Sequence, residues 1–491
     1  MSDGNNMMIH DFELQAEAFH QEMYREYYLA EAGLKEHLEI TPIYERYAHL
    51  FDERLVRELF TSDHNRQERY VTEWVTLEYL ENLVKGLTEH VINEMRKATV
   101  EWDGRPVSYH DLRAMMANEP DLLRRHQLDE LERKITATAN EERAARLRSL
   151  HDKARELGFE SYAELCDQLR GLRLITLTQQ MQALLDKTRE VFFHRLELYL
   201  RDMRVPVDEA RSCDILALFR GKRFDPLFPQ ESMMPALTST LLGLGIDTAR
   251  HENLEVDTEA RALKTPRAFC APIRIPEEVK LVTKPIGGPD DYASLLHEAG
   301  HAEHFVHVDP ALPFSYKRLG DNSVTEGYAF LFQYLLLNKG WLRRSLDIED
   351  SAEYVRLERF RKLWLLRRYA SKLLYERKLH TQLEGAEREY VNLLGETLGV
   401  AISAENYLAD TDDAFYCAQY LRAWIFEAQL RRWLEDQFGP EWFAAREAGQ
   451  YLVSLWKRGQ ELRAEELARE MGYDGLQPEY LMAELVEHED D

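Results

Sequence analysis

The chain has 491 residues, enough for about three domains or for one large helical body. Hydrophobic residues make up 45% and charged residues 31%, so the composition excludes disordered and collagen-like chains. The formal net charge of −26 would repel a phosphate backbone or an anionic membrane, and we expect no nucleic acid and no membrane as a partner.

Cysteine usage and the N-terminal segment indicate the compartment. No two of the four cysteines have the C-x-x-C spacing of a zinc or redox motif. The N-terminus shows no basic segment followed by an apolar run, and no stretch of eighteen residues is wholly apolar. These observations predict a cytoplasmic protein with reduced thiols, and they leave the oligomeric state open.

Proline placement divides the chain. Eleven of the 16 prolines fall between Pro206 and Pro313, and proline removes a backbone donor and clashes inside a helix. We therefore predict an N-terminal helical region over 1–205, a central region with a small sheet over 206–335 and a C-terminal helical region over 336–491. We expect the three to form one intertwined body.

The two flanks carry helical patterns. Apolar residues recur mostly at three- and four-residue steps over 174–192, which predicts one long amphipathic helix. Residues 415–438 are rich in aromatic residues and arginine and contain no helix breaker before Gly439-Pro440, which predicts a second long helix. We interpret the pair Arg367-Arg368 as part of a solvated helix face.

Two short segments of the central region carry strand signals. Residues 267–275 and 279–283 contain β-branched residues and are separated by Pro276-Glu-Glu. Prolines at 272 and 276 indicate that the first segment is an edge strand or contains a bulge. An edge strand just before a catalytic helix could bind an extended peptide through main-chain hydrogen bonds.

A metal-binding motif follows these strands. His297 and His301 are four residues apart, which places both imidazoles on one face of a helix, and Glu298 lies beside them in an H-E-x-x-H pattern typical of zinc binding. So short a pattern also arises by chance, but the apolar helical residues around it and the strands before it favour zinc. Because such a site already has its ligands, we interpret His304 and His307 as surface groups or as partners of the ligands.

A third ligand is needed, because catalytic zinc takes three protein ligands and keeps a fourth position for water. Glu326 lies 25 residues after His301 and opens an otherwise apolar helix, where a charged side chain needs a partner. Alternatively, Glu326 is a carboxylate stabilised by the dipole of a helix N-terminus. Its place after the motif favours the metal role, and we predict one Zn²⁺ per chain.

The stretch from about 257 to 335 resembles the helical zinc peptidases that include the thimet oligopeptidase and oligoendopeptidase F family and the angiotensin-converting enzyme family. Arg267, Ala268 and Phe269 resemble the strand region before the oligopeptidase zinc helix. The run from His297 to Glu326 resembles that of the converting enzymes. The resemblance implies a mainly α fold, with two helical halves around a deep substrate channel and a small β-sheet next to the zinc-binding helix.

The resemblance also implies roles for individual residues. Glu298 would be the general base for a zinc-activated water, and Arg267, Ala268 and Phe269 would contact the substrate. Residues 416–424 resemble the helix that carries a transition-state tyrosine, for which Tyr420 is the first choice and Tyr416 the second. Alternatively, two tyrosines on an aromatic helix are packed core residues.

The activity implied is hydrolysis of peptide bonds in short peptides by a zinc metallopeptidase. Two alternatives stay open. One is a metallocarboxypeptidase of the same clan, and the other is a non-catalytic zinc protein that binds peptides. Intact Glu298 argues against the second alternative, because a structural zinc site has no use for a base and closes all four positions with protein ligands.

Several positions depart from the converting-enzyme pattern. Asp410 stands about where those enzymes place an oxyanion-stabilising histidine, and 381–487 contains no histidine. Leu408 and Gln419 stand near the positions of a carboxylate-binding lysine and a chloride-binding arginine. We therefore do not expect strict release of dipeptides from C-termini. Phe330 lies four residues after Glu326, where an acidic partner of the zinc ligands is common, so another group must orient the histidines.

Overall fold

The computed structural model describes residues 2–60 and 65–486. The chain divides into two compact units, each assembled from separated stretches of sequence. The first consists of Met1–Tyr79, Arg223–Val355 and Arg422–Leu481, and the second of Leu80–Lys222, Arg356–Leu421 and Met482–Asp491. Each unit thus draws on all three regions expected from the proline distribution, and that division stays a prediction.

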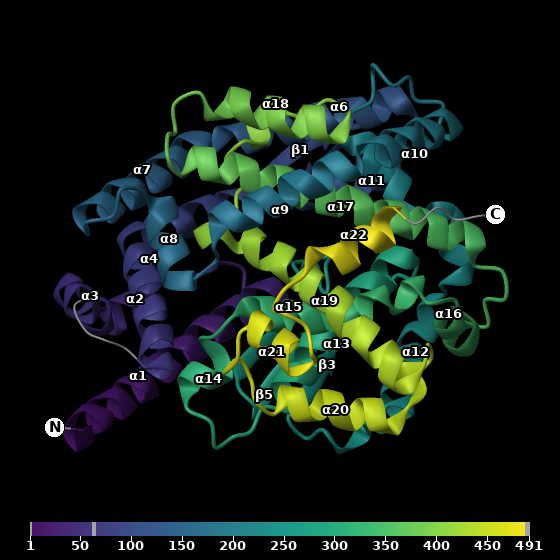
Figure 1. Cartoon of the computed structure of the whole chain (residues 1–491). Coiled ribbons are helices and arrows are strands. Elements are labelled where there is room, and N and C mark those ends of the chain that lie inside the picture. Colours follow the sequence, from purple (N-terminus) through teal and green to yellow (C-terminus); the bar gives the residue numbers. More distant parts are fainter. Residues whose placement is uncertain (1, 61–64, 487–491) are drawn as a thin grey trace. The chain divides into compact units, whose positions relative to one another are not determined.

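The first unit is mainly helical and contains the three-stranded sheet (Figure 1). Its elements are α1 (Ser2–Glu31), α2 (Thr41–Arg46), η1 (Ala48–Leu50), α3 (Glu53–Phe60), the start of α4 (Arg66–Lys97), most of η2 (Lys222–Leu227), η3 (Gln230–Ser232), α12 (Met233–Gly243), η4 (Thr248–Arg250), β3 (Leu254–Asp257), β4 (Phe269–Arg274), β5 (Glu278–Val282), α13 (Pro289–Val306), α14 (Phe314–Arg318), α15 (Asn322–Gln333), η5 (Tyr334–Leu337), α16 (Lys339–Leu346), the start of α17 (Ala352–Leu379), most of α19 (Tyr416–Phe438), η8 (Trp442–Ala444), α20 (Arg446–Trp456), α21 (Ala464–Glu470) and the start of α22 (Pro478–Val486).

The second unit is also mainly helical (Figure 1). Besides the remaining parts of α4, α17, α19 and α22, its elements are β1 (Thr99–Trp102), β2 (Arg105–Ser108), α5 (Tyr109–Asn118), α6 (Leu122–Thr138), α7 (Asn140–Glu156), α8 (Tyr162–Arg170), α9 (Leu174–Lys187), α10 (Arg189–Asp202), α11 (Ser212–Arg220), α18 (Ala386–Leu398), η6 (Ala404–Asn406) and η7 (Asp413–Phe415). The mainly α fold predicted from the sequence is confirmed.

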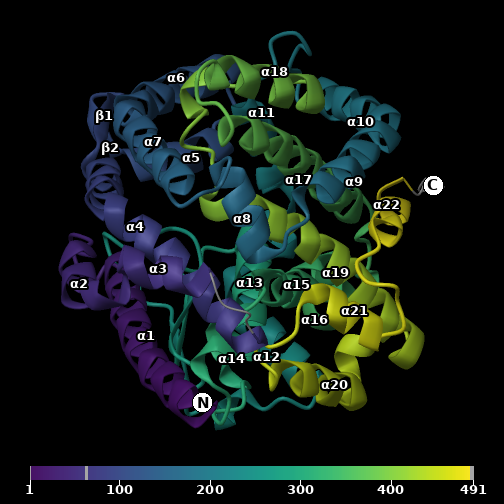
Figure 2. The same ribbon diagram turned by 60° about the vertical axis from the view of Figure 1, so that its left-hand side comes forward.

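The sheet of the first unit has the strand order β3–β5–β4. Strand β3 is parallel to β5, whereas β4 pairs antiparallel with β5 and shifts register between Pro272 and Arg274. Both predictions for this strand are confirmed, since β4 lies at the edge and is irregular where proline removes a donor. Helices α1 and α13 both pack against β4, which confirms a small sheet next to the H-E-x-x-H helix. Figure 2 shows α2 beside α1 in the same unit.

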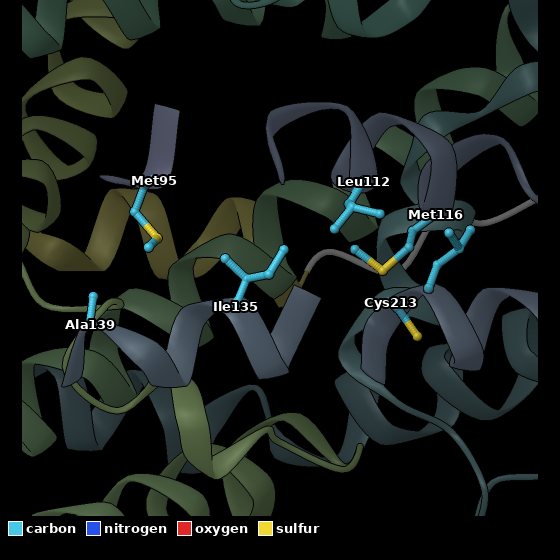
Figure 3. Packing of buried hydrophobic residues seen from close by; sticks show 7 residues of the cluster. Met95, Leu112, Met116, Ile135, Ala139 and Cys213 are labelled. Carbon is cyan, nitrogen blue, oxygen red and sulfur yellow. The ribbon is translucent and has the colours of Figure 1, made fainter. Parts of the chain in front are cut away.

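One hydrophobic cluster of the second unit forms where residues of α4, α5, α6 and α11 meet, with side chains of the hairpin β1–β2 packed against it. Figure 3 shows its buried side chains, which are Met95, Leu112, Met116, Leu128, Ile135, Ala139 and Cys213. The hairpin turns at Asp103-Gly104, whose φ values of 51° and 73° belong to a two-residue hairpin turn. This hairpin lies outside the central region, to which the predicted strands were confined, although an Asp-Gly pair is the local sign of such a turn.

The prediction of one continuous helix over 174–192 is wrong, because the segment is helical but breaks at Thr188 into α9 and α10. The guanidinium of Arg367 reaches this break, and its Nη1 donates to Leu185 O at 2.7 Å and to Thr188 Oγ1 at 2.8 Å. Arg367 is 1% exposed, so its interpretation as a solvated residue is also wrong. The long helix predicted over 415–438 is confirmed as α19.

Two further features bear on the sequence predictions. Within 2–60 and 65–486, no helix combines the length and the apolar character needed to cross a membrane. All four cysteines carry free thiols.

Candidate metal centre

Helix α13 begins at a sequence that fixes its start. Gly287 and Gly288 have φ values of 89° and 88°, a region that favours glycine, and Pro289 then occupies the first helical position. The carboxylate of Asp291 accepts from the backbone N–H groups of Ile286 and Gly287 at 2.6 and 2.9 Å. This anchored start sets the rotation of the helix and hence the direction of His297 and His301, the two predicted ligands.

Helix α15 is anchored by a buried ionic network. Asp321 caps it by accepting from Ser323 N at 3.0 Å, and its other oxygen lies 2.5 Å from Arg422 Nη2. The same guanidinium reaches Glu465, and Ala464 N also donates to Asp321. Because Asp321 and Arg422 are both buried, each charge depends on the other, and the pair holds the turn that precedes Glu326.

Helices α13 and α15 lie side by side (Figure 1) and approach closely at Gly300. A Cβ at this position would lie 2.7 Å from Ala329 Cα and 2.7 Å from Tyr328 O, closer than any real side chain permits. Only glycine allows these two backbones to come so near. The close approach brings Glu326 within reach of the histidines on the neighbouring helix.

The predicted ligands His297, His301 and Glu326 do come together. One donor atom of each lies within 4.8 Å of the other two. Glu326 Oε2 lies 3.4 Å from His297 Nε2 and 3.5 Å from His301 Nε2. Tetrahedral zinc with bonds of about 2.0–2.2 Å separates neighbouring ligands by roughly 3.3–3.6 Å. The donor set of two imidazoles and one carboxylate therefore fits zinc in both chemistry and spacing.

The electrostatics of the three residues are coupled. Burial alone would lower the pKa of His297, but the carboxylates of Glu326 and Glu298 outweigh it and raise that pKa. Burial would likewise raise the pKa of Glu326, yet the two imidazoles hold it below its ordinary range. The ionised carboxylate that a metal requires is thus favoured.

Two residues that the sequence analysis missed orient the histidines. His297 Nδ1 lies 2.9 Å from Gln333 Oε1, and His301 Nδ1 lies 2.9 Å from Thr325 Oγ1. Both partners belong to α15, one directly before Glu326 and the other two turns after it. Polar residues at those places in an apolar helix are the only sequence signal that could have pointed to them.

Phe330 occupies the place where an acidic partner is common, and the structure shows what it does there. Its ring lies 5.2 Å from the His297 ring and stacks on Trp424 at 4.6 Å, measured between centroids. The indole Nε1 of Trp424 in turn donates to Tyr334 Oη at 2.5 Å. The aromatic packing supports the His297 ring from the side, while Gln333 supplies the polar contact.

The carboxylate of Glu298 lies against the edge of the sheet. Its Oε2 accepts a hydrogen bond of 2.8 Å from the backbone N–H of Cys270, the second residue of β4. Phe269 begins β4, and Ala268 and Arg267 directly precede it, so the segment predicted to contact substrate adjoins the residue predicted to be the base. Its substrate-binding role stays a prediction.

Tyr416 and Tyr420 belong to the second unit, on the first turns of α19. Their ring centroids are 5.0 Å apart, and Tyr420 lies 5.3 Å from Tyr369. Two residues with left-handed backbone, Ala414 and Phe415, immediately precede this helix. The oxyanion role of the two tyrosines stays a prediction.

Two of the positions that depart from the converting-enzyme pattern, Asp410 and Gln419, have other partners within the second unit. Asp410 accepts from Tyr390 Oη at 2.8 Å and pairs with Arg368 and Lys372. Gln419 Oε1 accepts from Arg170 Nη1 at 3.1 Å. Asp410 and Gln419 therefore make structural contacts inside their own unit.

His304 is fully buried, so the interpretation of this residue as a surface group is wrong. Its ring stacks on Phe305 at 4.9 Å and meets the edge of Tyr328 at 5.1 Å. Burial lowers the pKa of His304 to about 3, which keeps the imidazole neutral. It packs in the core between α13 and α15.

Comparison by sequence finds no relative, since no family model and no curated protein matches the chain. Comparison of folds does find similar structures. A protein assigned as oligoendopeptidase F from Bacillus anthracis str. Ames has a TM-score of 0.60 and 13% identity, over 94% of this chain and 83% of that one. A second oligoendopeptidase F structure gives a TM-score of 0.65 and 13% identity, over 94% and 84%. The structure of BsuCP gives 0.59 and 13%, over 98% and 97%.

The arrangement is that of a mainly α protein with a zinc-type donor set on two adjacent helices beside a small sheet. Its fold is the fold of the oligoendopeptidase F structures. The resemblance to that family predicted from the sequence is thus confirmed at the level of the fold.

Proposed function

We propose that the protein is a zinc metallopeptidase that hydrolyses peptide bonds in short peptides. One observation carries the proposal: His297, His301 and Glu326 gather their donor atoms within 4.8 Å, with the carboxylate of Glu298 next to them at the edge of β4. Three protein ligands and an adjacent carboxylate are the components of a hydrolytic site rather than a closed structural one. The shared fold with oligoendopeptidase F structures supports the same conclusion.

Each residue of the proposed site has its own role in hydrolysis. His297, His301 and Glu326 would hold one zinc ion, which when bound supplies a Lewis acid for the scissile carbonyl and a water of lowered pKa. Glu298 takes the proton of the attacking water and returns it to the leaving amine. Gln333 and Thr325 keep the imidazoles in place. Tyr420, or Tyr416 in its place, would donate a hydrogen bond to the oxyanion.

The edge strand β4 provides a way to bind the substrate. In an antiparallel pair, the N–H and C=O of one residue point the same way, and Cys270 N points away from β5 toward Glu298. The Cys270 carbonyl and the backbone of Ala268 are therefore the groups to pair with an extended peptide. Arg267 and Phe269 would contact its side chains.

The experiment is peptide cleavage by the purified full chain, with and without a zinc chelator. We expect internal cleavage of a mixed library of short peptides that stops with chelator and returns with added zinc. Binding without cleavage would favour the non-catalytic alternative, and chelator-resistant cleavage would contradict the metal mechanism. Amidation of a substrate's C-terminus should leave the rate nearly unchanged, whereas a metallocarboxypeptidase would lose most of its activity.

A cytoplasmic location is part of the same proposal. Four free thiols and the absence of a C-x-x-C pair support a cytoplasmic location, where disulfides are rare. Short peptides are the expected partners. The expectation that the chain binds neither nucleic acid nor membrane rests on its net charge of −26.

A further inference from the structure

A second group of metal-type ligands lies on a different face of α13 from His297 and His301. Each residue of an α-helix turns by about 100°, so Glu303 lies roughly 200° around the helix from His301. Glu303 and His307 are four residues apart and therefore share this face. His251, from the segment between η4 and β3, joins them, and one donor atom of each lies within 4.8 Å of the other two.

The spacing of this cluster leaves room for an ion. Glu303 Oε1 lies 3.7 Å from His251 Nδ1, and Glu303 Oε2 lies 3.6 Å from His307 Nδ1. Both separations are too long for hydrogen bonds. The Glu303–His251 separation is close to the 3.4 and 3.5 Å that separate the ligand atoms at Glu326 and to the roughly 3.3–3.6 Å expected between two ligands of one zinc ion. One donor atom of His307 lies within 4.8 Å of the ligand atoms of the other two residues.

Buried polar atoms of the cluster lack the partners that the protein interior normally supplies. The Glu303 side chain is 1% exposed, and its two ionisable neighbours within 4.0 Å among the described residues are His251 and His307. Over the described part of the chain, Glu303 Oε2 and His251 Nδ1 are buried and have no hydrogen-bond partner. A carboxylate buried in this way is unfavourable unless a cation or a donor satisfies it.

Two other clusters of similar composition differ in this respect. Asp214, next to His126 and Cys213, accepts from Arg125 Nε at 2.7 Å and from the Arg211 backbone at 2.8 Å. Its charge is already neutralised by a guanidinium.

The cluster of Glu376, Asp412 and Cys417 has a cationic partner as well, in Lys372. Lys372 Nζ lies 2.9 Å from Asp412 Oδ2, and Glu376 accepts from Asp412 N and from the Cys417 thiol. In contrast, the cluster at Glu303 has two imidazoles and no lysine or arginine partner among the described residues.

Neighbouring contacts hold the ligands in position. His307 Nδ1 donates to the backbone carbonyl of Glu303 at 2.8 Å, which fixes the tautomer with its lone pair on Nε2. Metal-ligating histidines commonly donate their other nitrogen to a carbonyl in this way. Asn253 Nδ2 donates to Val306 O at 3.0 Å and to Pro276 O at 2.7 Å, so the segment that carries His251 is tied to the end of α13.

We propose that His251, Glu303 and His307 form a second binding site for a divalent transition-metal ion, and the donor set of this site fits zinc. Two imidazoles and one carboxylate are a zinc donor set. The ion would bind at the Glu303 carboxylate, whose Oε2 has no hydrogen-bond partner among the described residues. The ion links the segment before β3 to the C-terminal end of α13. This site is separate from the peptidase proposal and stands or falls independently of it.

The test is the zinc stoichiometry of the full chain after dialysis against buffered free zinc, measured by elemental analysis. We expect two zinc ions per unmodified chain and one in each of His251→Asn, Glu303→Gln and His297→Asn. The double variant His251→Asn/His297→Asn should bind none. The matched control is His37→Asn, because His37 is exposed in the same unit and should leave the stoichiometry at two.

A second measurement uses the His297→Asn background, in which only the proposed site remains. Added zinc should raise the melting temperature of this variant, because an ion that binds only the folded state stabilises it. The increase should disappear in His251→Asn/His297→Asn and in Glu303→Gln/His297→Asn, because each double variant lacks a ligand of both sites. Far-UV circular dichroism establishes that each variant is folded.

Two outcomes would overturn the inference. One is a single zinc ion in the unmodified chain that His297→Asn removes and His251→Asn does not. The other is two zinc ions that both persist in folded His251→Asn and Glu303→Gln. Neither outcome depends on peptide cleavage, so failure of this site and failure of the peptidase proposal are distinguishable.

Discussion

The amide oxygen of Gln333 lies 2.9 Å from Nδ1 of His297, at the other end of the imidazole from the nitrogen that faces Glu326. Because an amide oxygen only accepts, Nδ1 carries the proton and Nε2 keeps its lone pair for a metal. Helix α15 therefore supplies both Glu326, the proposed third ligand, and the group that sets the tautomer of His297.

Replacement of Gln333 by leucine should weaken zinc binding about 10–100-fold, because the ring loses the partner that fixes its orientation. The measurement is a competition titration of the metal-free chain against a zinc chelator of known affinity. Gln333→Glu keeps an acceptor and should retain the affinity. The control is Gln182→Leu, at an exposed position of α9 in the other unit. Equal affinity in Gln333→Leu and the unmodified chain would show that this contact does not orient the ligand.

Gly300→Ala should separate α13 from α15. Its Cβ would meet backbone atoms at 2.7 Å, which cannot be relieved by a side-chain rotation, so we expect a loss of about 1–3 kcal/mol in the free energy of unfolding. Zinc affinity should fall as well, because Glu326 moves away from the histidines. The matched control is Gly86→Ala inside α4, where no atom lies within 4 Å and a gain of about 0.5–1 kcal/mol is expected. Denaturant unfolding measures both.

The part of the site that could be predicted from the sequence is the part that depends on local spacing. His297 and His301 share a helix face at any four-residue step, and Glu326 is a charge at the start of an apolar helix. Gln333, Thr325 and the close approach at Gly300 depend on which helix lies opposite, and no local pattern encodes that.

The fold shows the same division. The long helix α19 and the edge strand β4 follow, within a few residues, from local composition and from where proline and glycine stand. The break at Thr188 does not, because it accompanies a buried Arg367 more than 170 residues away in the sequence, which satisfies backbone and side-chain oxygens there. Arg367 shows that a charged side chain on a helix is buried when carbonyls replace water as its partners.

Glu298→Gln should keep zinc and lose turnover. Glutamine preserves the size of the side chain and can still accept the hydrogen bond from Cys270 N, but it cannot take a proton from water. We expect turnover of a short peptide to fall by about two to four orders of magnitude, with one equivalent of zinc retained at this site. Glu277→Gln, at an exposed position next to the sheet, is the control and should leave turnover unchanged. Near-normal hydrolysis by Glu298→Gln would show that the proton is handled elsewhere.

Tyr420→Phe should lower turnover by about a hundredfold with little change in peptide affinity, as expected for the loss of one oxyanion donor. Tyr416→Phe should have a smaller effect, because this tyrosine lies one helical turn earlier and supports the other ring. Tyr480→Phe, which alters an exposed tyrosine, is the control. A full loss in Tyr416→Phe with none in Tyr420→Phe would reverse the assignment of the two rings.

The buried pair of Asp321 and Arg422 should make stability depend on pH in the acid range. Burial would raise the pKa of Asp321, but the guanidinium groups of Arg422 and Arg463 outweigh it and lower that pKa below its unfolded value of about 3.9. A lowered pKa in the folded state means that the contribution is fully present above about pH 5 and is lost as the pH falls. Asp321→Asn should therefore cost about 1–3 kcal/mol of unfolding free energy at neutral pH.

The difference between the unmodified chain and Asp321→Asn should shrink as the pH falls below about 4, because protonation of Asp321 removes the same charge that the substitution removes. Urea unfolding at a series of pH values measures this difference directly. Asp350→Asn is the matched control, since Asp350 also accepts from a backbone N–H at a helix start but is exposed. Its effect should stay within about 0.5 kcal/mol at every pH. A difference for Asp321→Asn that does not change with pH would show that the contribution comes from helix capping, which asparagine preserves, rather than from the charge pair with Arg422.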